Sequence, residues 1–238
     1  MRLIDALGVR RGDVVSFVGG GGKTSLALCL AQEAAALGWK AVFTVTAKIK
    51  PPALPVFASV ESLEFAGGPV CLAGPLRQDG KLAGVSYEEV AAVAAVADLV
   101  SVEADGSAGR SLKFPQAHEP VIPTCSTIVV PVAGASVVGR AISPELVHRS
   151  SEAAEFVGSD VATPSVVARL LWHPDAATRG RPSSARVVPA INQADSVERL
   201  AAARAVAAEL IALGAPLVLL TAAQSDPPVI ELVVQEGS

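Results

Sequence analysis

The feature that most constrains this chain is a run of four glycines, Gly19, Gly20, Gly21 and Gly22, followed by Lys23 and Thr24. A β-branched and aromatic segment, Val14 to Val18, precedes the run, and apolar residues at helical spacing follow it as far as Gly38. A strand, a glycine loop and a helix in this order build an anion site, because the loop offers unobstructed backbone N–H groups and the helix adds its positive end. The order predicts a phosphate-binding loop in an α/β fold.

The residues after the glycines suit a nucleotide. We expect Lys23 to place its ammonium beside the β and γ phosphates and the Thr24 hydroxyl to bind Mg²⁺, with Ser25 completing the motif. The usual pattern is G-x-x-x-x-G-K-[ST], but Phe17 stands five residues before Gly22, so this loop is a shorter G-x-x-G-K-T. The predicted ligands are ATP or GTP with Mg²⁺. A glycine turn that only lets a helix pack closely is the structural alternative.

An acidic motif follows a second buried segment. Leu99 to Val102 reads as a strand and leads into Glu103-Ala104-Asp105-Gly106, where a P-loop protein carries its metal-linked carboxylate. In one arrangement Asp105 holds Mg²⁺ through water and Glu103 orients the nucleophile; in the other, Glu103-x-x-Gly106 senses the γ-phosphate. A solvated turn is the alternative. The catalytic candidates are therefore Lys23, Glu103 and Asp105, and the metal candidates are Thr24 and Asp105.

A third motif suggests base recognition. Asn192-Gln193-Ala194-Asp195 follows another predicted strand and resembles the [NT]-K-x-D guanine motif, with Gln193 in place of lysine. The Asp195 carboxylate could accept from N1–H and the 2-amino group of guanine, whereas adenine presents an acceptor at N1. Thr221-Ala222-Ala223 would back the base. The alternative is that Asp195 only caps the long helix that follows.

Second-rank candidates could contact an anionic substrate or the γ-phosphate: Arg110, Lys113, Thr46 and Lys48. The first two follow the acidic motif and the others close a predicted strand, Ala41 to Thr46. A solvated basic loop and ordinary β-propensity explain them equally well. His118 and His148 are isolated, which favours structural roles.

Strands that alternate with helices predict right-handed β-α-β crossovers, with ligands at the carboxyl ends of the strands. The expected fold is a three-layer, P-loop NTPase-like α/β domain of residues 1–238, with a mainly parallel sheet and helices on both faces. Four further strands are expected at Thr127 to Val132, Arg186 to Ile191, Pro216 to Leu220 and, at the edge, Val229 to Val234. A helix of residues 86–97 should begin with a capping box, and Pro144 to Val157 and Thr163 to Trp172 should form a small helical insertion at about 144–175.

Composition and charge limit the kinds of partner that this chain is expected to bind. Hydrophobic residues make up 51% of the chain and its mean hydropathy is +0.48, but no apolar run reaches the ~18 residues of a bilayer span. We therefore expect no membrane association. The net charge of −4 argues against nucleic acid, and the start lacks the features of a signal peptide, which predicts a cytoplasmic protein. Three widely separated cysteines support neither a disulfide framework nor a zinc site.

Several blocks together resemble one known family. Phe17 to Ser25 is similar to F-V-G-x-G-G-K-T-T, and Val102 to Lys113 is similar to the distinctive V-E-A-D-G-x-x-G-R-P-L-K block. His118 to Pro123, Val147-His148-Arg149 and Asn192 to Asp195 follow in the expected order. The chain thereby resembles the YqeC-like accessory proteins of selenium-dependent molybdenum hydroxylases. It departs from their pattern at Val45, Ala47, Ser111 and Gln193.

The resemblance implies a P-loop NTPase that assists the maturation of a molybdenum hydroxylase, with the apo-enzyme or its other accessory proteins as partners. No residue here indicates selenium. Two alternatives stay open: an ATP-dependent ligase or kinase acting on a small acid, because the short loop also resembles that of Mur-type ligases, and a non-hydrolysing, nucleotide-gated interaction protein. The oligomeric state is open, a dimer included.

Overall fold

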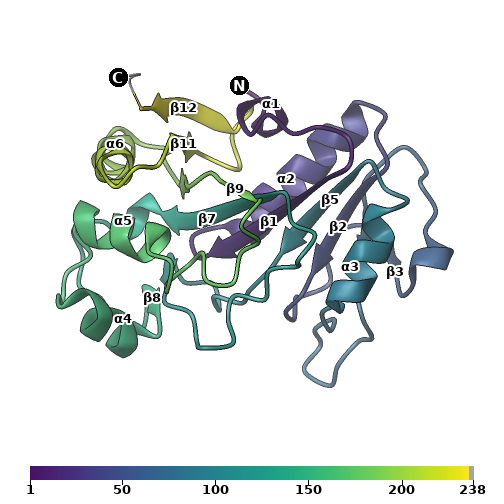
Figure 1. Ribbon diagram of the computed structural model, residues 1–238, viewed down its shortest axis with the longest axis horizontal. Coiled ribbons are helices and arrows are strands. Elements are labelled where there is room, and N and C mark those ends of the chain that lie inside the picture. The colour runs from purple at the N-terminus through teal and green to yellow at the C-terminus, as the bar shows by residue number, and fades with distance from the viewer. Residues whose placement is uncertain (236–238) are drawn as a thin grey trace.

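The computed structural model describes residues 1–235, which form one large sheet with helices on both faces. The sheet has ten strands in the order β12-β11-β10-β7-β1-β5-β2-β4-β3, with β9 paired to β7 (Figure 1). All pairs are parallel except β11 with β12. Their bounds are β1 (Asp13–Gly19), β2 (Ala41–Val45), β3 (Val56–Phe57), β4 (Val70–Leu72), β5 (Leu99–Glu103), β7 (Ile128–Gly134), β9 (Arg186–Val187), β10 (Ala190–Asn192), β11 (Leu217–Thr221) and β12 (Val229–Val234).

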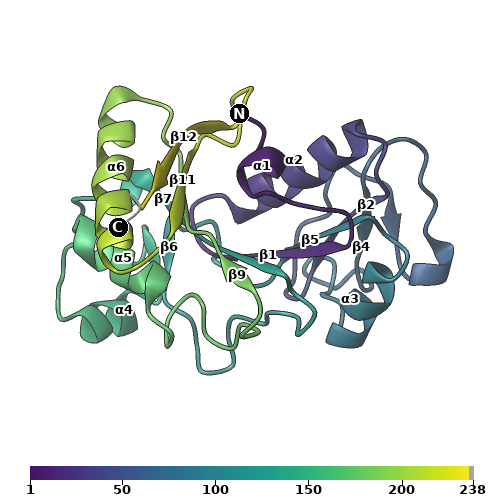
Figure 2. The same ribbon diagram turned by 45° about the horizontal axis from the view of Figure 1, so that its top comes forward.

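The helices complete a three-layer α/β arrangement, as expected (Figure 1, Figure 2). Helices α1 and α2 pack on one face, where α1 lies beside β12, while α3, α5 and α6 cover the other. The bounds are α1 (Leu3–Ala6), α2 (Lys23–Ala36), α3 (Tyr87–Ala94), α4 (Ser150–Val157), α5 (Pro164–Trp172) and α6 (Val197–Ala212), with short 3₁₀ turns η1 (Val60–Ser62) and η2 (Ala135–Val137).

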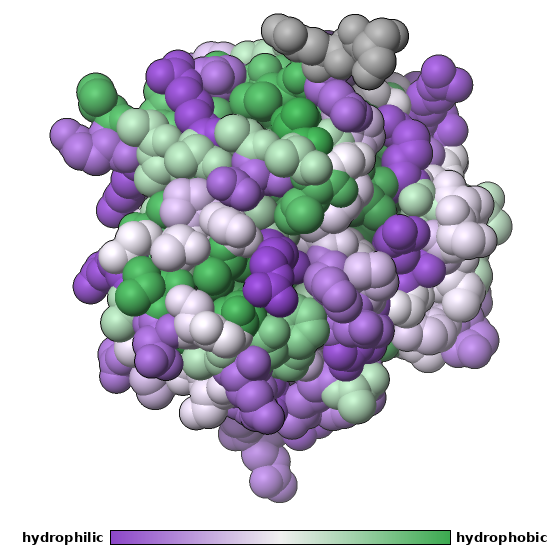
Figure 3. All heavy atoms as spheres, turned by 60° about the vertical axis from the view of Figure 1, so that its left-hand side comes forward, coloured by the Kyte–Doolittle hydropathy of each residue, from purple (hydrophilic) through white to green (hydrophobic). Residues whose placement is uncertain are grey.

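The central strands are buried on both sides. Phe17 and Phe43 point into the apolar cluster beneath α2, whereas Val14 and Val18 belong to the cluster on the opposite face. Strands covered on both faces read as continuous apolar runs, which accounts for the high hydrophobic content of the sequence. On the face that carries α4, α5 and α6, apolar and polar side chains mix in small groups (Figure 3).

The register brings the sequence motifs to one edge of the sheet. On β1, Phe17 pairs with Glu103 of β5 and Gly19 pairs with Val132 of β7. Because parallel strands end on the same side, the glycine loop, the acidic motif and the segment after Asn192 meet there. The expectation that the motifs lie at the carboxyl ends of the strands is confirmed.

Two predicted elements are wrong in their bounds. The helix expected from Pro144 begins only at Ser150, because Val147–His148 forms strand β8, which pairs with β6 (Leu112–Lys113) in a separate two-stranded sheet. The strand expected from Arg186 to Ile191 is divided into β9 and β10 around Pro189, which has no N–H to donate.

Other predicted elements are confirmed. Thr163 caps α5 with Pro164 in the first turn, β12 is an antiparallel edge strand, and Gly38 and Gly214 follow the ends of α2 and α6 with positive φ. No helix among residues 1–235 has both the length and the apolar character needed to cross a bilayer.

The capping box at the start of α3, which the sequence predicted, can be tested directly by mutation. The Ser86 hydroxyl accepts from Glu89 N at 3.2 Å, and the Glu89 carboxylate accepts from Ser86 N at 2.7 Å. Replacing Ser86→Ala should lower the free energy of unfolding by about 1 kcal/mol in urea titration, since the first turn loses an acceptor. Ser184→Ala, at an exposed serine outside any helix, is the control; equal losses in the two variants would contradict the cap.

Candidate functional site

The first three glycines fix the loop to the rest of the protein. Gly19 N donates to Asp105 Oδ2 at 3.0 Å, Gly20 N to the Val132 carbonyl at 2.8 Å, and Gly21 N to the Arg110 carbonyl at 2.8 Å. These N–H groups are therefore already used. Their role is to set the curvature of the loop, and this differs from the expectation that all four glycines offer donors to phosphate.

Positions 21 and 22 of the loop admit only glycine. Gly21 has φ +73°, and a Cβ there would lie 2.0 Å from Gly134 N. Gly22 has φ +110°, and its Cβ would lie 2.3 Å from Asn192 Nδ2. Side chains at these two positions would collide with neighbouring strands as well as strain the backbone.

The open donors lie at the start of α2. The N–H groups of Gly22, Lys23, Thr24 and Ser25 make no hydrogen bond to any described residue. They line a cleft together with Glu103. Because the unpaired N–H groups of a helix start carry partial positive charge, this turn is suited to bind an anion.

The Lys23 side chain is held in place by other groups of the protein. It is 2% exposed, and its Nζ donates to the Gly19 carbonyl at 2.7 Å and to Ser107 Oγ at 3.1 Å. Asp105 Oδ1 lies 3.1 Å from the same nitrogen and is buried without a hydrogen bond of its own. The ammonium is thus fixed at the base of the loop.

The two acids of the motif have different surroundings. The Asp105 side chain is 2% exposed and lies between Lys23 and Lys113, whose Nζ is 3.4 Å from Asp105 Oδ2. Lys113 is itself buried and reaches Glu119 at 3.0 Å and the Gly106 carbonyl at 2.7 Å. Asp105 and Lys113 therefore form a charge cluster behind the loop, and neither lines the cleft, although Lys113 was a substrate candidate.

Glu103 is the acid that faces the cleft. Its side chain is 13% exposed, and its Oε2 accepts from Thr24 Oγ1 at 2.6 Å. Burial raises the pKa of Glu103, while the Lys23 ammonium at 3.9 Å and the Thr24 hydrogen bond act in the opposite direction. The sequence motif suggested Asp105 as the metal candidate, but of the two acids only Glu103 lines the cleft, so the geometry favours Glu103.

The pair of Thr24 and Glu103 fits Mg²⁺. A hydroxyl and a carboxylate side by side offer hard oxygen ligands at a helix start where phosphates would bind. Residues 1–235 contain no group of three or more His, Cys, Asp or Glu side chains that could hold a metal ion. The ion would therefore take its other ligands from phosphate and water, which is the usual habit of Mg²⁺.

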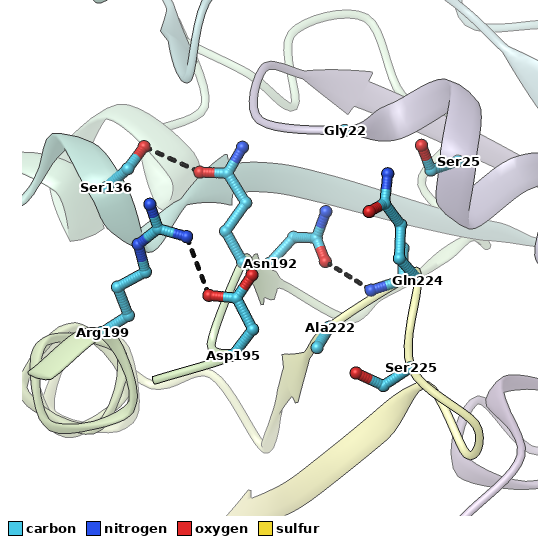
Figure 4. Close-up of a pocket in the computed structure, with 11 residues that line it drawn as sticks. Gly22, Ser25, Ser136, Asn192, Asp195, Arg199, Ala222, Gln224 and Ser225 are labelled. Carbon is cyan, nitrogen blue, oxygen red and sulfur yellow. Dashed lines mark hydrogen bonds and ion pairs between the residues drawn. The ribbon is translucent and has the colours of Figure 1, made fainter. Parts of the chain in front are cut away.

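Two cavities meet at the loop. The larger, of about 780 Å³, extends from the start of α2 past Glu103, and the smaller, of about 340 Å³, lies toward β10 and β11 (Figure 4). Gly22, Ser25 and Gln193 line both. A ligand that crosses at these residues would extend into both cavities.

Asn192 joins the smaller cavity to the glycine loop. Its Nδ2 donates to the Gly21 carbonyl at 2.8 Å, and its Oδ1 accepts from Thr221 Oγ1 at 3.1 Å. The same oxygen accepts from Ala223 N at 3.1 Å (Figure 4). The side chain is buried, and all its interactions are internal. Its role is to hold the loops on either side of the cavity at a fixed distance.

Gln193 lines both cavities. Its backbone has φ +65°, and its Oε1 accepts from Ser136 Oγ at 2.7 Å. A Cβ at Gly134 would lie 2.4 Å from the same oxygen, so a larger residue there would displace the Gln193 side chain.

Asp195 lies at the side of the smaller cavity and is half exposed. Its carboxylate accepts from Arg199 Nη1 at 2.8 Å (Figure 4). The alternative that it caps the following helix is wrong, because α6 begins at Val197 and Ser196 is the capping residue, accepting from Arg199 N.

The remaining candidates divide into two groups. Arg110 and Lys48 line the larger cavity, where Arg110 donates to the Pro144 and Ala108 carbonyls. Thr46 does not line it, and its hydroxyl donates to the Val121 carbonyl. Sequence reasoning missed Ser107, the hydroxyl partner of Lys23; the only signal was its place directly after the acidic motif.

Comparison with known proteins places the chain among relatives of one family. A family described as YqeC protein matches residues 15–151. The Escherichia coli (strain K12) protein described as "Uncharacterized protein YqeC" is 33% identical over 217 residues, which cover 82% of each chain. No solved structure matches the chain.

The buried charge cluster of Asp105 should contribute more to the free energy of unfolding than an exposed ion pair does. Asp105→Asn leaves Lys23 and Lys113 facing each other without the charge between them, so the free energy of unfolding should fall by about 3 kcal/mol in urea titration. Asp195→Asn, which breaks an exposed ion pair, should cost less than about 0.5 kcal/mol. Equal losses would contradict an anchoring role for Asp105.

Glu103 should make stability depend on pH. The pKa of Glu103 is raised in the folded protein, which means that ionisation of this carboxyl group opposes folding. Below about pH 4 the group is protonated in both the folded and the unfolded state, and stability is unaffected. As pH rises through the folded pKa, the free energy of unfolding falls. Glu103→Gln should therefore unfold at higher urea than the original protein at pH 7, and the difference should disappear near pH 4. A difference of the same size at both pH values would contradict this assignment.

Proposed function

The chain belongs to the YqeC family, and we propose that it is a Mg²⁺-dependent nucleotide-binding protein that hydrolyses GTP and thereby assists another protein. The observation that carries the proposal is the set of four unpaired N–H groups from Gly22 to Ser25, next to the fixed ammonium of Lys23. Donors that converge on an open cleft, beside a cation and a helix start, match the needs of a polyphosphate.

The two cavities suggest how the nucleotide lies. The nucleoside occupies the smaller cavity beside Asn192 and Asp195, and the phosphates cross Gly22 and run along the start of α2 toward Thr24. This direction places the terminal phosphate in the larger cavity, near Glu103.

Guanine suits the smaller cavity better than adenine. Asp195 uses Oδ1 for Arg199, while Oδ2 makes no hydrogen bond to a described residue. A carboxylate at this position can accept from the N1–H and 2-amino groups of guanine, and adenine has no donor at N1. We therefore propose GTP as the preferred ligand.

The chemistry would come from positioning and electrostatics. Lys23 and the N–H groups of α2 stabilise charge on the phosphate oxygens, and Asp105 holds Lys23 at the loop. Thr24 and Glu103 would hold Mg²⁺, which when bound neutralises phosphate charge. Glu103 and Thr24 also lie where an attacking water could be oriented.

The accessory role follows from the family resemblance. On that ground we place the protein in the maturation of a molybdenum hydroxylase, with the apo-enzyme or another of its accessory proteins as partner. Hydrolysis would then serve to change the affinity for that partner, as expected of a nucleotide-dependent switch.

Calorimetry with GTP and ATP in the presence of Mg²⁺ tests the ligand. Lys23→Ala should weaken binding of both nucleotides by about 100-fold, since a buried charge contact to phosphate is lost. Asp195→Ala should weaken GTP by about 10- to 100-fold and leave ATP unchanged, because only guanine donates to this carboxylate. Phosphate release in the same samples measures hydrolysis.

Asp175→Ala, at an exposed acid outside both cavities, is the matched control and should bind like the original protein. Thermal melting must show that Lys23→Ala is folded, because Lys23 belongs to the buried charge cluster. Absence of binding by either nucleotide to the unaltered protein would refute the proposal, and a preference for ATP that survives Asp195→Ala would refute its guanine part.

A further inference from the structure

The larger cavity is strongly basic. Its charged lining consists of one acid, Glu103, and five cations: Lys23, Lys48, Lys50, Lys81 and Arg110. The chain as a whole carries a net charge of −4. Positive charges are therefore concentrated at this cavity although the net charge of the chain is negative, which indicates an anionic ligand.

Three of these cations lie outside both the phosphate loop and the Val102 to Lys113 block that contains Arg110. Lys48 and Lys50 follow β2, and Lys81 lies more than thirty positions further along the chain, before α3. We call these three residues the lysine wall. Its two segments are joined by reciprocal backbone hydrogen bonds between Ile49 and Leu82, at 3.1 and 2.8 Å. Backbone pairing thus brings the lysines together although their charges repel.

The lysine wall has little internal compensation. Lys48 Nζ lies 3.2 Å from Asp79 Oδ2, in an exposed pair. The ammonium groups of Lys50 and Lys81 make no ion pair or hydrogen bond to a described residue, and Lys81 is partly buried. Two unpaired ammonium groups at one cavity can each bind an anionic oxygen of a ligand, so the ligand would offer at least two such oxygens.

The proposed nucleotide leaves this part of the cavity open. Its base lies in the other cavity, and its phosphates are matched by the N–H groups of Gly22 to Ser25 and by Lys23. At about 780 Å³, the larger cavity has more than twice the volume of the smaller one. A triphosphate along the start of α2 would leave space between itself and the lysine wall.

We propose that the lysine wall is the subsite of a second substrate, a small molecule with at least two phosphate or carboxylate charges, which binds beside the terminal phosphate of the nucleotide. The inference rests on the proposed function for the position of the nucleotide. It gives the protein a two-substrate site in which nucleotide turnover responds to a small anionic metabolite as well as to a protein partner.

The test is calorimetric binding of two probes, inorganic phosphate and succinate, at constant ionic strength. The protein is first saturated with Mg²⁺ and the non-hydrolysable β,γ-imido analogue of GTP. At least one probe should bind the loaded protein, and the double variant Lys50→Ala/Lys81→Ala should weaken that probe by at least about tenfold, while its affinity for the analogue stays within about threefold. The probe that binds more tightly identifies the acid class.

Arg10→Ala/Lys40→Ala removes the same charge from exposed positions near the opposite ends of β1 and β2 and should leave probe binding within about twofold. The subsite is refuted if neither probe binds the loaded protein, if both double variants weaken the probe equally, or if Lys50→Ala/Lys81→Ala loses the analogue as fully as Lys23→Ala. If the analogue does not bind the unaltered protein, the proposed function fails; the same variants and probes, measured without nucleotide, then decide on the subsite alone.

Discussion

The arrangement of the site depends on one buried carboxylate. Asp105 accepts from the N–H of Gly19 and lies within 3.5 Å of two ammonium groups, those of Lys23 and Lys113. Removal of charges from water is costly unless they are paired. Asp105 and the two lysines therefore stabilise one another, and loss of any one of them leaves a buried charge without its partner. Glu119 adds a second acid to Lys113 and moves the cluster toward charge balance. The glycine loop is anchored to this cluster and to the neighbouring strands.

An anchored loop binds a ligand at lower cost than a mobile one. The N–H groups of Gly20 and Gly21 are held by carbonyls of two different segments, and Asn192 holds the Gly21 carbonyl from a third. The open donors of α2 are therefore oriented before any anion arrives. This is the physical reason for the glycines, since Cβ atoms at Gly21 or Gly22 would break the contacts that fix the loop.

Much of this fold could be predicted from sequence, because its strongest signals are local. Continuous apolar strands, glycines after helices and the Ser86 capping box each depend on a few adjacent residues. The errors arose where a distant partner decides: Val147–His148 becomes a strand only because β6 lies beside it. Ser196, rather than Asp195, caps α6, since both residues are good caps and Arg199 pairs with the carboxylate. The short strands β3 and β4 also lacked a clear local pattern.

The site shows the same division between local and distant information. The motif put two acids near the loop, but their roles separate only in three dimensions, where Glu103 ends β5 beside Thr24 and Asp105 turns under the loop. Lys48 could be proposed from its position after a strand. Lys81 could not, because its place in the cavity depends on the Ile49–Leu82 pairing. A sequence motif thus identifies the residues that we propose for the phosphates. The residues suited to select a second ligand come from segments that only the folded chain brings together.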